Sequence, residues 1–324
     1  MSNPRIQYVT VLLPTYNLAE YLKYAIKSIL NQSFRKFELL IVDDGSTDNT
    51  VDIVKSFNDS RIVYLQKAHT GLSNTMNYGL RKARYDWIAI MEADDIAFPT
   101  RLEKEIDFMN KNPEFSVVSC WYAVFKNSRI SYIVPTPNSH NKIIHQLALH
   151  SPICNQGVIY NKREIVALGG YDNNLREYDL WLRIKDDVKY YNIPELLMLV
   201  RFREDSLTNH SVTEHKRIVY LSQSPFYKIG LDKEFGLNSE SKQIEIKAWR
   251  EWFYGHKSKA RNYWIKKPLI LLKPKIILGY ILSFLPNKYL VLVQRLNLRY
   301  RIKYIFTDRN LKRKLKYVIT KVYD

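Results

Sequence analysis

The 324-residue sequence has little cysteine and no long apolar run, and each shortage excludes a class of protein. Its two cysteines, Cys120 and Cys154, lack a metal-binding spacing, so a reducing cytoplasm fits this chain best. No apolar stretch reaches about 18 residues, and we therefore expect no helix that spans a bilayer. The first residues lead directly into the strand-like run YVTVLLP (8–14), so we expect no signal peptide.

Acidic residues are scarce at the carboxyl end, where basic residues are concentrated. Residues 256–324 hold eighteen Lys and Arg against Asp308 and Asp324, a local net charge of +16 out of +18, which leaves about +2 for residues 1–255. A nearly neutral body with a basic tail indicates a surface for attachment or for a partner. The longest apolar block of the tail, 276–285, is too short to cross a bilayer but suits a segment in the plane of a membrane surface.

The first hundred residues alternate between two hydrophobic periods. Continuous apolar runs typical of buried parallel strands occupy 8–14, 37–44, 61–66 and 87–95. Apolar residues at helical spacing occupy the intervening segments 18–32, 49–57 and 72–83. This alternation predicts an α/β fold with an open parallel sheet, whose ligands bind at the carboxyl ends of the strands.

The sequence beyond residue 98 continues without an obvious linker. Helices are expected from Pro99 and over 141–150 and 177–187, strands over 115–125, 155–160 and 188–202, and a turn at 168–172. We therefore divide the chain into a domain at 1–205, a helical segment at 206–255 and a basic, membrane-associating extension at 256–324.

Three of the predicted strands end in side chains that could bind a ligand. These are Pro14, Thr15 and Tyr16 after the first strand, Asp43 and Asp44 after the second, and Glu92, Asp94 and Asp95 after the fourth. Because the carboxyl ends of parallel strands meet at one edge of a sheet, we expect these groups to lie close together. Each group taken singly is also typical of a structural feature, such as a strand terminator, a capped turn or a solvated turn.

The acids of the stretch EADD (92–95) raise a question of charge. Carboxylates this close raise one another's pKa unless something positive lies among them, and no cation is adjacent in the sequence. A solvated turn would explain how these carboxylates are tolerated. A divalent ion would explain it as well, because hard carboxylate oxygens suit Mg²⁺ or Mn²⁺. An ion that bridges a diphosphate would also explain the lack of lysines near these acids.

A further pair of acids, Glu177 and Asp179, lies at the start of the apolar helix in REYDLWLR (176–183). The helix dipole favours carboxylates at this end, so simple capping would account for them. The functional interpretation is a general base that deprotonates an incoming hydroxyl group.

Five segments together resemble the inverting glycosyltransferases of family 2, which have the GT-A fold. The segments are VTVLLPTYN, LLIVDDGSTDNT, HTGLSNTMNYGL, IAIMEADD with FPTRLEKEIDFM, and LGGYDNNLREYDLWLR. The resemblance covers about residues 7–205 and implies a Rossmann-like, mostly parallel sheet flanked by helices, with a nucleotide-sugar-binding half at 1–98 and an acceptor half at 99–205. It also implies a metal-dependent transfer of a sugar from a nucleotide sugar, with UDP favoured, to a hydroxyl group of a saccharide or glycolipid.

The resemblance assigns the donor's base to the ends of the first two strands. Pro14, Thr15 and Tyr16 would line the base pocket of the nucleotide-sugar donor. Asp44 would hydrogen-bond the nucleobase, and Asp43 would lie close by.

The resemblance also assigns the metal and the catalytic base. Glu92 and Asp94 would take the outer positions of the family's DxD motif, where Asp94 would bind Mn²⁺ or Mg²⁺ and Glu92 would contact the ribose, or the ion through water. Asp95 would help to hold the donor sugar. Glu177 aligns with the acid usually assigned as the base, and Asp179 follows it in the same motif. Glu92 stands where the family usually has Asp, and Arg-Glu at 176–177 stands for its usual Glu-Asp, so the choice between Glu177 and Asp179 stays open.

Two other classes of protein stay open, the first suggested by these departures and the second by the charge of the tail. One is a nucleotide-sugar-binding protein without catalysis. The other is a nucleic-acid binder, because Tyr is interleaved with Lys and Arg in RYRIKYIF (299–306). The apolar blocks of the tail fit an anionic membrane surface better, and no nucleic acid is expected. We therefore expect a cytoplasmic enzyme of cell-surface polysaccharide biosynthesis, peripheral on the inner face of the membrane, with a saccharide or lipid-linked oligosaccharide acceptor.

Overall fold

The computed structural model describes most of the chain up to residue 203 and parts of the remainder. The described residues are 5–126, 129–147, 151–172, 176–203, 240–254, 257–265, 274–284 and Val318. The chain forms two compact units, the first made of Met1–Ile143, Pro152–Phe202 and Tyr304–Asp324, and the second of Ile144–Ser151 and Arg203–Lys303. The domain boundary expected at residue 205 and most of the helical segment expected at 206–255 lie outside the described residues. Residues 240–254 of that segment form a helix.

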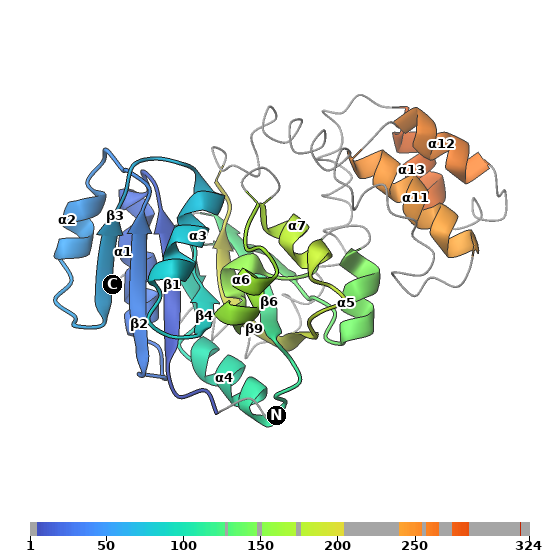
Figure 1. Ribbon diagram of the computed structural model, residues 1–324. Helices are drawn as coiled ribbons and strands as arrows, with labels where there is room; N and C mark the ends of the chain where they lie inside the picture. The colour runs from blue at the N-terminus through green and yellow to red at the C-terminus, as the bar shows by residue number, and fades with distance from the viewer. Residues whose placement is uncertain are drawn as a thin grey trace. The chain divides into compact units, whose positions relative to one another are not determined.

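The first half of the first unit has the predicted strand–helix alternation (Figure 1). Its strands are β1 (Val9–Thr15), β2 (Phe37–Asp43), β3 (Ile62–Gln66) and β4 (Trp87–Ile90), and its helices are α1 (Ala19–Leu30), α2 (Thr50–Lys55) and α3 (Leu72–Lys82). The four strands are parallel and lie in the order β3-β2-β1-β4. All seven residues of β1 are buried, which explains why its sequence is apolar throughout rather than alternating.

Within the described residues, the second half completes a nine-stranded sheet of the expected α/β fold, and both parallel and antiparallel pairs occur in it. Its elements are β5 (Ile96–Ala97), α4 (Arg101–Lys111), β6 (Val117–Lys126), β7 (Arg129–Val134), α5 (His140–Leu147), the 3-10 turn η1 (Asn155–Gly157), β8 (Ile159–Asn161), α6 (Lys162–Ala167), α7 (Arg176–Arg183) and β9 (Tyr190–Arg201). Strand β8 is antiparallel to both β4 and β6. Strand β7 is antiparallel to β6, and β5 is antiparallel to β9. Strands β6 and β9 pair in the parallel sense.

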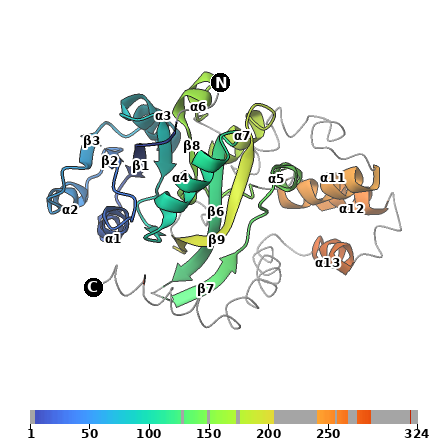
Figure 2. The same ribbon diagram turned by 90° about the horizontal axis from the view of Figure 1, so that it is seen from below.

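Helices cover both faces of the sheet. Figure 2 shows α1 and α3 on opposite sides of β1 and β2. On the α1 side, the buried residues Val11 and Leu13 of β1 pack in one core with Ile26 and Ile29 of α1. On the other side, α3 approaches β1 so closely that a Cβ atom at Gly79 would lie 2.4 Å from a methyl carbon of Leu12. This packing fixes the helices and therefore the loops at the carboxyl ends of the strands.

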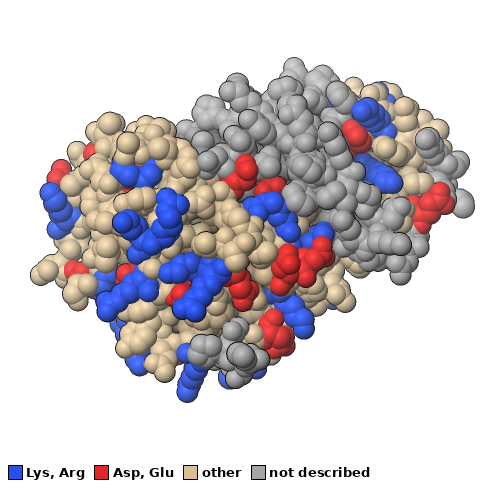
Figure 3. Space-filling model, viewed as in Figure 1, with Lys and Arg blue, Asp and Glu red and all other residues tan. Residues whose placement is uncertain are grey.

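The charged surface of the first unit is uneven even though residues 1–255 carry only about +2. Figure 3 shows Lys and Arg side chains gathered over α3 and α6. Arg81 and Lys82 there lie over the ring of Tyr78, and Arg163 forms an ion pair with Asp86 at 2.7 Å. Many of these cations thus have partners within the fold.

The second unit contains three described helices, α11 (Glu240–Tyr254), α12 (Lys257–Ile265) and α13 (Pro274–Leu282). Trp252, Trp264 and Ile276 are almost completely buried in a cluster that these helices share. A Cβ atom at Gly279 of α13 would lie 2.5 Å from the ring of Trp249, so glycine allows the close approach of these helices. Among the described residues, no helix is long and apolar enough to cross a membrane.

The end of the basic tail, Tyr304–Asp324, belongs to the first unit, and Val318 is its described residue. Val318 is 3% exposed and packs in a cluster with Ile96, Phe98, Phe125 and Leu199, which come from the region of β5, β6 and β9. The tail at 256–324 therefore does not form one separate extension, since this residue lies against the sheet while α12 and α13 belong to the second unit.

Candidate functional site

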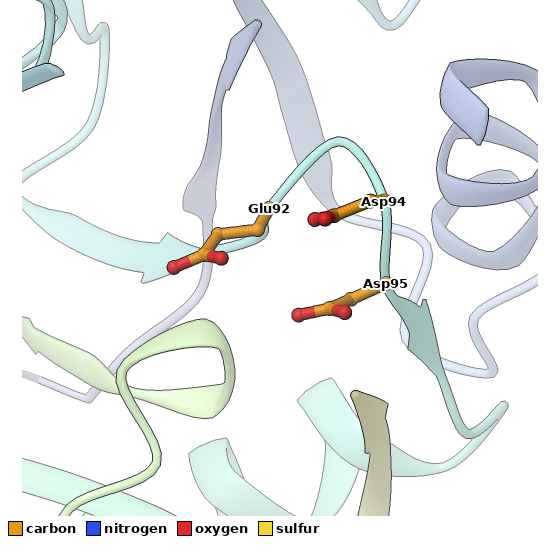
Figure 4. A group of neighbouring side chains, drawn as sticks. All are labelled: Glu92, Asp94 and Asp95. Atoms are coloured by element: carbon orange, nitrogen blue, oxygen red, sulfur yellow. The ribbon is translucent and has the colours of Figure 1, made fainter. Parts of the chain in front are cut away.

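Three carboxylates gather in the turn that follows β4. Glu92, Asp94 and Asp95 each offer an oxygen atom, and these oxygens all lie within 4.8 Å of one another. Figure 4 shows the side chains of Asp94 and Asp95 pointing the same way, toward Glu92 across the turn. The turn is closed by a hydrogen bond of 3.3 Å from the backbone N–H of Asp95 to the carbonyl of Glu92. Hard oxygen ligands at this spacing could hold a divalent cation.

One acid of this cluster, Asp95, is almost completely buried. Burial raises the pKa of Asp95 well above its ordinary value, and the neighbouring Asp94 and Glu92 raise it further. Asp95 is 1% exposed, and its Oδ2 atom has no hydrogen-bond partner within the described part of the chain. A buried, unpartnered carboxylate oxygen beside two further carboxylates is a donor set that fits Mn²⁺ or Mg²⁺.

The counter-charge absent from the local sequence comes from β9. Arg201 donates its backbone N–H to Oδ1 of Asp95 at 2.8 Å and its Nε–H to the carbonyl of Asp94 at 2.8 Å. Its guanidinium group lies between the rings of Tyr21 and Phe125, 4.7 and 4.5 Å from their centres. We did not identify Arg201 from the sequence, although an arginine at the end of the last predicted strand was a signal that could have found it.

The two acids at the end of β2 are engaged within the fold. Asp43 accepts hydrogen bonds from the backbone N–H of Ser46 at 2.8 Å and from the hydroxyl of Tyr64 at 2.5 Å. Asp44 is 3% exposed and accepts hydrogen bonds from the backbone N–H groups of Thr70 at 3.0 Å and Gly71 at 2.8 Å. Both acids therefore hold the loops around the sheet edge in place.

A buried ion pair adds to the contacts of Asp44. The Nζ atom of Lys67, at the end of β3, contacts Oδ1 of Asp44 and also donates to the hydroxyl of Thr70 at 2.6 Å. Burial by itself would raise the pKa of Asp44, but the hydrogen bonds from Lys67, Thr70, Thr75 and Gly71 outweigh it, and the pKa lies below its ordinary value. Asp44 is therefore a carboxylate anion at neutral pH.

The residues at the end of β1 differ in what they offer a ligand. Pro14 and Thr15 are buried in the strand, whereas Tyr16 is 42% exposed. The ring of Tyr16 stacks on that of His69, with ring centres 4.1 Å apart. Asn17 has a positive φ of 50° and joins the turn after β2, where its side-chain oxygen accepts from the backbone N–H of Thr47 at 2.8 Å. Of the three residues predicted to line a base pocket, only Tyr16 presents an exposed side chain.

The two acids of α7 have different surroundings. Asp179 is 1% exposed and accepts a hydrogen bond of 2.7 Å from Nε of Arg183, whose other nitrogens donate to the carbonyls of Leu168 and Gly170. Burial raises the pKa of Asp179, and Arg183 opposes that rise. Asp179 thus holds the turn at 168–170 through Arg183, whereas Glu177 is only half-buried.

The hydroxyl group of Tyr171 is buried and is influenced by charges on α7 and in the acid cluster. Burial raises the pKa of its hydroxyl well above the ordinary value, and the nearby Tyr160, Glu177 and Glu92 raise it further. Glu177 and Glu92 therefore both lie within electrostatic range of one hydroxyl group. The backbone of Tyr171 is fixed by Asn77 of α3, whose side chain donates to its carbonyl at 2.7 Å and accepts from its N–H at 2.9 Å.

This chain is similar in sequence to a family model and to individual proteins that are named as glycosyltransferases. Residues 10–168 match the model of the family described as glycosyl transferase family 2. The chain is 32% identical over 220 residues to EpsE of Bacillus subtilis (strain 168), which is named as a glycosyltransferase, with 63% of this chain and 77% of EpsE covered. It is 28% identical over 230 residues to the O-antigen biosynthesis glycosyltransferase WbnJ of Escherichia coli, with 68% and 89% covered.

Two solved structures share the fold. The mannosyltransferase PcManGT from Pyrobaculum calidifontis, in complex with GDP-Man and Mn²⁺, aligns with a TM-score of 0.55 at 15% identity and covers 85% of this chain and 83% of its own. TarS 1–349 of S. aureus, in complex with UDP-GlcNAc, aligns with a TM-score of 0.53 at 18% identity, covering 85% and 79%. At these identities the likeness establishes a common fold.

Proposed function

We propose that this chain, which belongs to glycosyltransferase family 2, moves the sugar of a nucleotide-sugar donor, a UDP-sugar, to a hydroxyl group of a saccharide or glycolipid. The transfer would proceed with inversion and with the help of a divalent cation. The observation that carries the proposal is the acid cluster after β4. It places three carboxylates within 4.8 Å at the sheet edge where ligands of α/β proteins bind.

The cation would be held by Asp94, with Glu92 and Asp95 beside it. The unpartnered Oδ2 of Asp95 and the proximity of the three carboxylates support this assignment. A bound Mn²⁺ or Mg²⁺ supplies positive charge for the departing nucleoside diphosphate. Arg201 keeps the turn in position through the backbone of Asp94 and the carboxylate of Asp95.

Glu177 would act as the general base. It is half-buried and lies within electrostatic range of the hydroxyl of Tyr171, as does Glu92 of the acid cluster. Asp179 is less suited to the role because it is almost fully buried and bound to Arg183. The carboxylate of Glu177 would take the proton of an acceptor hydroxyl group. At the same time, the oxygen of that hydroxyl group would bond to the anomeric carbon of the donor sugar, and the bond from this carbon to the diphosphate would break on the opposite face. A single displacement of this kind inverts the configuration.

The proposed nucleotide, UDP, and the proposed acceptor are suggested by similar proteins. The family resemblance and the UDP-GlcNAc complex of TarS favour UDP, whereas PcManGT was solved with GDP-Man. The name of WbnJ supports an acceptor in surface polysaccharide biosynthesis. A panel of UDP-, GDP-, CDP- and TDP-sugars, tested for hydrolysis with Mn²⁺, should give turnover with a UDP-sugar. Turnover only with another nucleotide would contradict the choice of UDP, and binding without any turnover would favour a protein that has lost catalysis.

We further propose that the second unit attaches the enzyme to an anionic membrane surface, on the inner face of the cell membrane. On α13, Ile277 and Ile281 are 44% and 57% exposed, and Phe284 just beyond the helix is 63% exposed. Their spacing of four and three residues gathers them on one helical face. Residues 256–303, which belong to this unit, hold twelve Lys and Arg and no Asp or Glu, and this charge complements anionic head groups.

Flotation with liposomes tests this attachment. The wild type should float with vesicles that contain about one third anionic lipid, and Ile281→Glu should remain in the soluble fraction, because a charge on the apolar face opposes insertion. Val166→Glu is a matched control, since Val166 is 51% exposed on α6 of the first unit. A wild type that stayed soluble at low salt, or an Ile281→Glu variant that floated as well as the wild type, would refute the attachment.

A further inference from the structure

A pair of tyrosine rings lies at the amino ends of the parallel strands. Tyr8 directly precedes β1 and Tyr85 lies just before β4, and these two strands are parallel neighbours. The rings stack with their centres 5.1 Å apart and an angle of 18° between their planes. Tyr8 is 45% exposed. Because the acid cluster follows the carboxyl end of β4, the tyrosine pair lies at the opposite edge of the sheet.

Exposed cations lie beside both rings. The Nζ atom of Lys36, which precedes β2, is 5.8 Å from the ring centre of Tyr8. The guanidinium carbon of Arg84 is 5.5 Å from the ring centre of Tyr85. The last turn of α3 adds two more exposed cations just before Arg84, and Figure 3 shows Lys and Arg side chains gathered over this helix. We call these residues the basic patch: Tyr8, Lys36, Arg81, Lys82, Arg84 and Tyr85.

The acids next to the basic patch are engaged within the fold. Glu38 accepts hydrogen bonds from the hydroxyl of Thr10 at 2.5 Å and from the backbone N–H of Arg84 at 2.6 Å. Asp86 forms an ion pair with Arg163 at 2.7 Å. Within the described part of the chain, none of the four cations of the basic patch forms an ion pair. The basic patch therefore keeps an excess of positive charge on a unit whose sequence is nearly neutral.

We propose that the basic patch is a membrane-contact surface of the first unit, which binds anionic lipid head groups and adds to the attachment through the second unit. This inference rests on the proposed function, because it takes the enzyme to work at an anionic membrane. Lys and Arg near such a surface are attracted to the head groups. Tyrosine is enriched at the membrane–water interface, since its ring is apolar and its hydroxyl group is polar.

The position of the basic patch is compatible with catalysis at the membrane. Ligands of α/β sheets bind at the carboxyl ends of the strands. A contact at the amino ends therefore leaves the edge with the acid cluster free for the donor and the acceptor. Because one chain carries both membrane contacts, the binding of the second unit raises the effective concentration of the basic patch at the surface. The patch should therefore strengthen attachment measurably even though it is small.

Sedimentation of the full chain with sucrose-loaded vesicles measures this contribution. Vesicles with about one third phosphatidylserine in phosphatidylcholine serve as the anionic surface. The double variant Lys36→Gln/Arg84→Gln should partition onto them about ten- to thirtyfold less than the wild type, since each cation near the surface contributes about fivefold. The loop should stay in place, because Glu38 accepts from the backbone of Arg84 and not from its side chain.

A matched variant controls for net charge. Lys55→Gln/Lys111→Gln removes the same charge from exposed positions at the ends of α2 and α4, and it should partition nearly as the wild type does. Donor hydrolysis with Mn²⁺ should be the same in the wild type and in both double variants, because none of these side chains belongs to the candidate site.

A fluorescent probe at position 8 reports direct contact. The native cysteines, Cys120 and Cys154, are almost completely buried, so a polarity-sensitive thiol probe should label an introduced surface cysteine selectively. The probe on Tyr8→Cys should shift its emission to shorter wavelength when anionic vesicles are added. The same probe on Lys55→Cys, at the exposed end of α2, should not shift.

The remaining outcomes would overturn the inference. Equal partition of the wild type and Lys36→Gln/Arg84→Gln would do so, and a loss of binding in Ile281→Glu would then leave the attachment through the second unit intact. An equal loss in Lys55→Gln/Lys111→Gln would show a general effect of net charge. Equal shifts of the probes at positions 8 and 55, or no shift at position 8, would exclude a specific contact. A wild type that binds no anionic vesicle would overturn both the attachment and this inference, while donor hydrolysis would still test the transfer.

Discussion

Arg201 donates its backbone N–H to the carboxylate of Asp95 at 2.8 Å, across 106 residues of sequence. The bond joins the end of β9 to the acid turn after β4, just where the short strand β5 pairs with β9. The guanidinium group of Arg201 donates to the carbonyl of Asp94 in the same turn, whose own sequence neighbourhood contains no cation. The last strand of the sheet therefore shapes a candidate metal site whose ligands all come from one turn.

Asp94 is the first residue to test at this site. Asp94→Ala should lower kcat by about a thousandfold or more, since loss of the ion removes the charge that stabilises the leaving diphosphate. Transfer or donor hydrolysis with Mn²⁺ measures the loss, and circular dichroism should show an unchanged fold. Asp107→Ala, at an exposed acid on α4, is the control and should keep full activity. An Asp94→Ala enzyme with wild-type turnover would refute the assignment.

Removal of the metal should have the same effect without any substitution. Dialysis against EDTA should abolish transfer, and added Mn²⁺ or Mg²⁺ should restore it, because carboxylate oxygens of the acid cluster prefer hard divalent ions. The measurement is the initial rate as a function of metal concentration after dialysis. Undiminished activity in excess EDTA would show that catalysis does not depend on a divalent cation.

Glu177 and Asp179 should separate into a catalytic and a structural residue. Glu177→Gln should lower kcat by about a hundredfold to ten-thousandfold with little change in thermal stability, because it removes only the base. Asp179→Asn should instead lower the melting temperature, since Arg183 would lose its anionic partner in a buried pair.

Steady-state kinetics and thermal unfolding of the two variants, side by side, provide this test. The reverse pattern, in which Asp179→Asn loses kcat without loss of stability and Glu177→Gln remains active, would assign the base to Asp179.

The contacts of Asp44 should make stability depend on pH in a defined window. Its folded pKa lies below the ordinary value, so the stabilisation is complete above about pH 4 and is lost as pH falls through the lowered folded pKa. Asp44→Asn should therefore destabilise the protein by about 1–3 kcal/mol at pH 7, the usual cost of losing charge-assisted hydrogen bonds. The difference between variant and wild type in thermal unfolding should shrink below about pH 4. A difference that stayed constant from pH 7 to pH 3 would contradict this account of Asp44.

Much of the fold of the first half could be predicted because its signals are local. The strands β1 to β3 and the helices α1 and α3 begin and end within two residues of the predicted bounds. Buried parallel strands have continuous apolar runs, and helices have an apolar period of 3.6 residues, so each element is readable in its own sequence.

The elements of the second half were harder to predict from the sequence because they depend on pairing with distant strands. The expected strand at 87–95 ends at Ile90, since the carboxylates that follow form a turn instead of continuing the ladder. Part of the strand expected at 155–160 is the 3-10 turn η1. Strand β7 and helix α6 were not predicted. Direction was also undetermined, because an apolar run such as β8 reads the same whether its neighbours are parallel or antiparallel.

The sequence by itself determined which chemical groups stand at the ends of the strands: Tyr16 after β1, two acids after β2 and three after β4. Only the tertiary structure decided what each group contacts. Arg201 faces Asp95, His69 covers Tyr16 and approaches Asp44, and Glu177 shares the neighbourhood of Tyr171 with Glu92. Hydrogen bonds and ion pairs act over a few ångströms, whereas most of these partners are separated by 25 to 106 positions, so the order of strands in the sheet determines which of them meet.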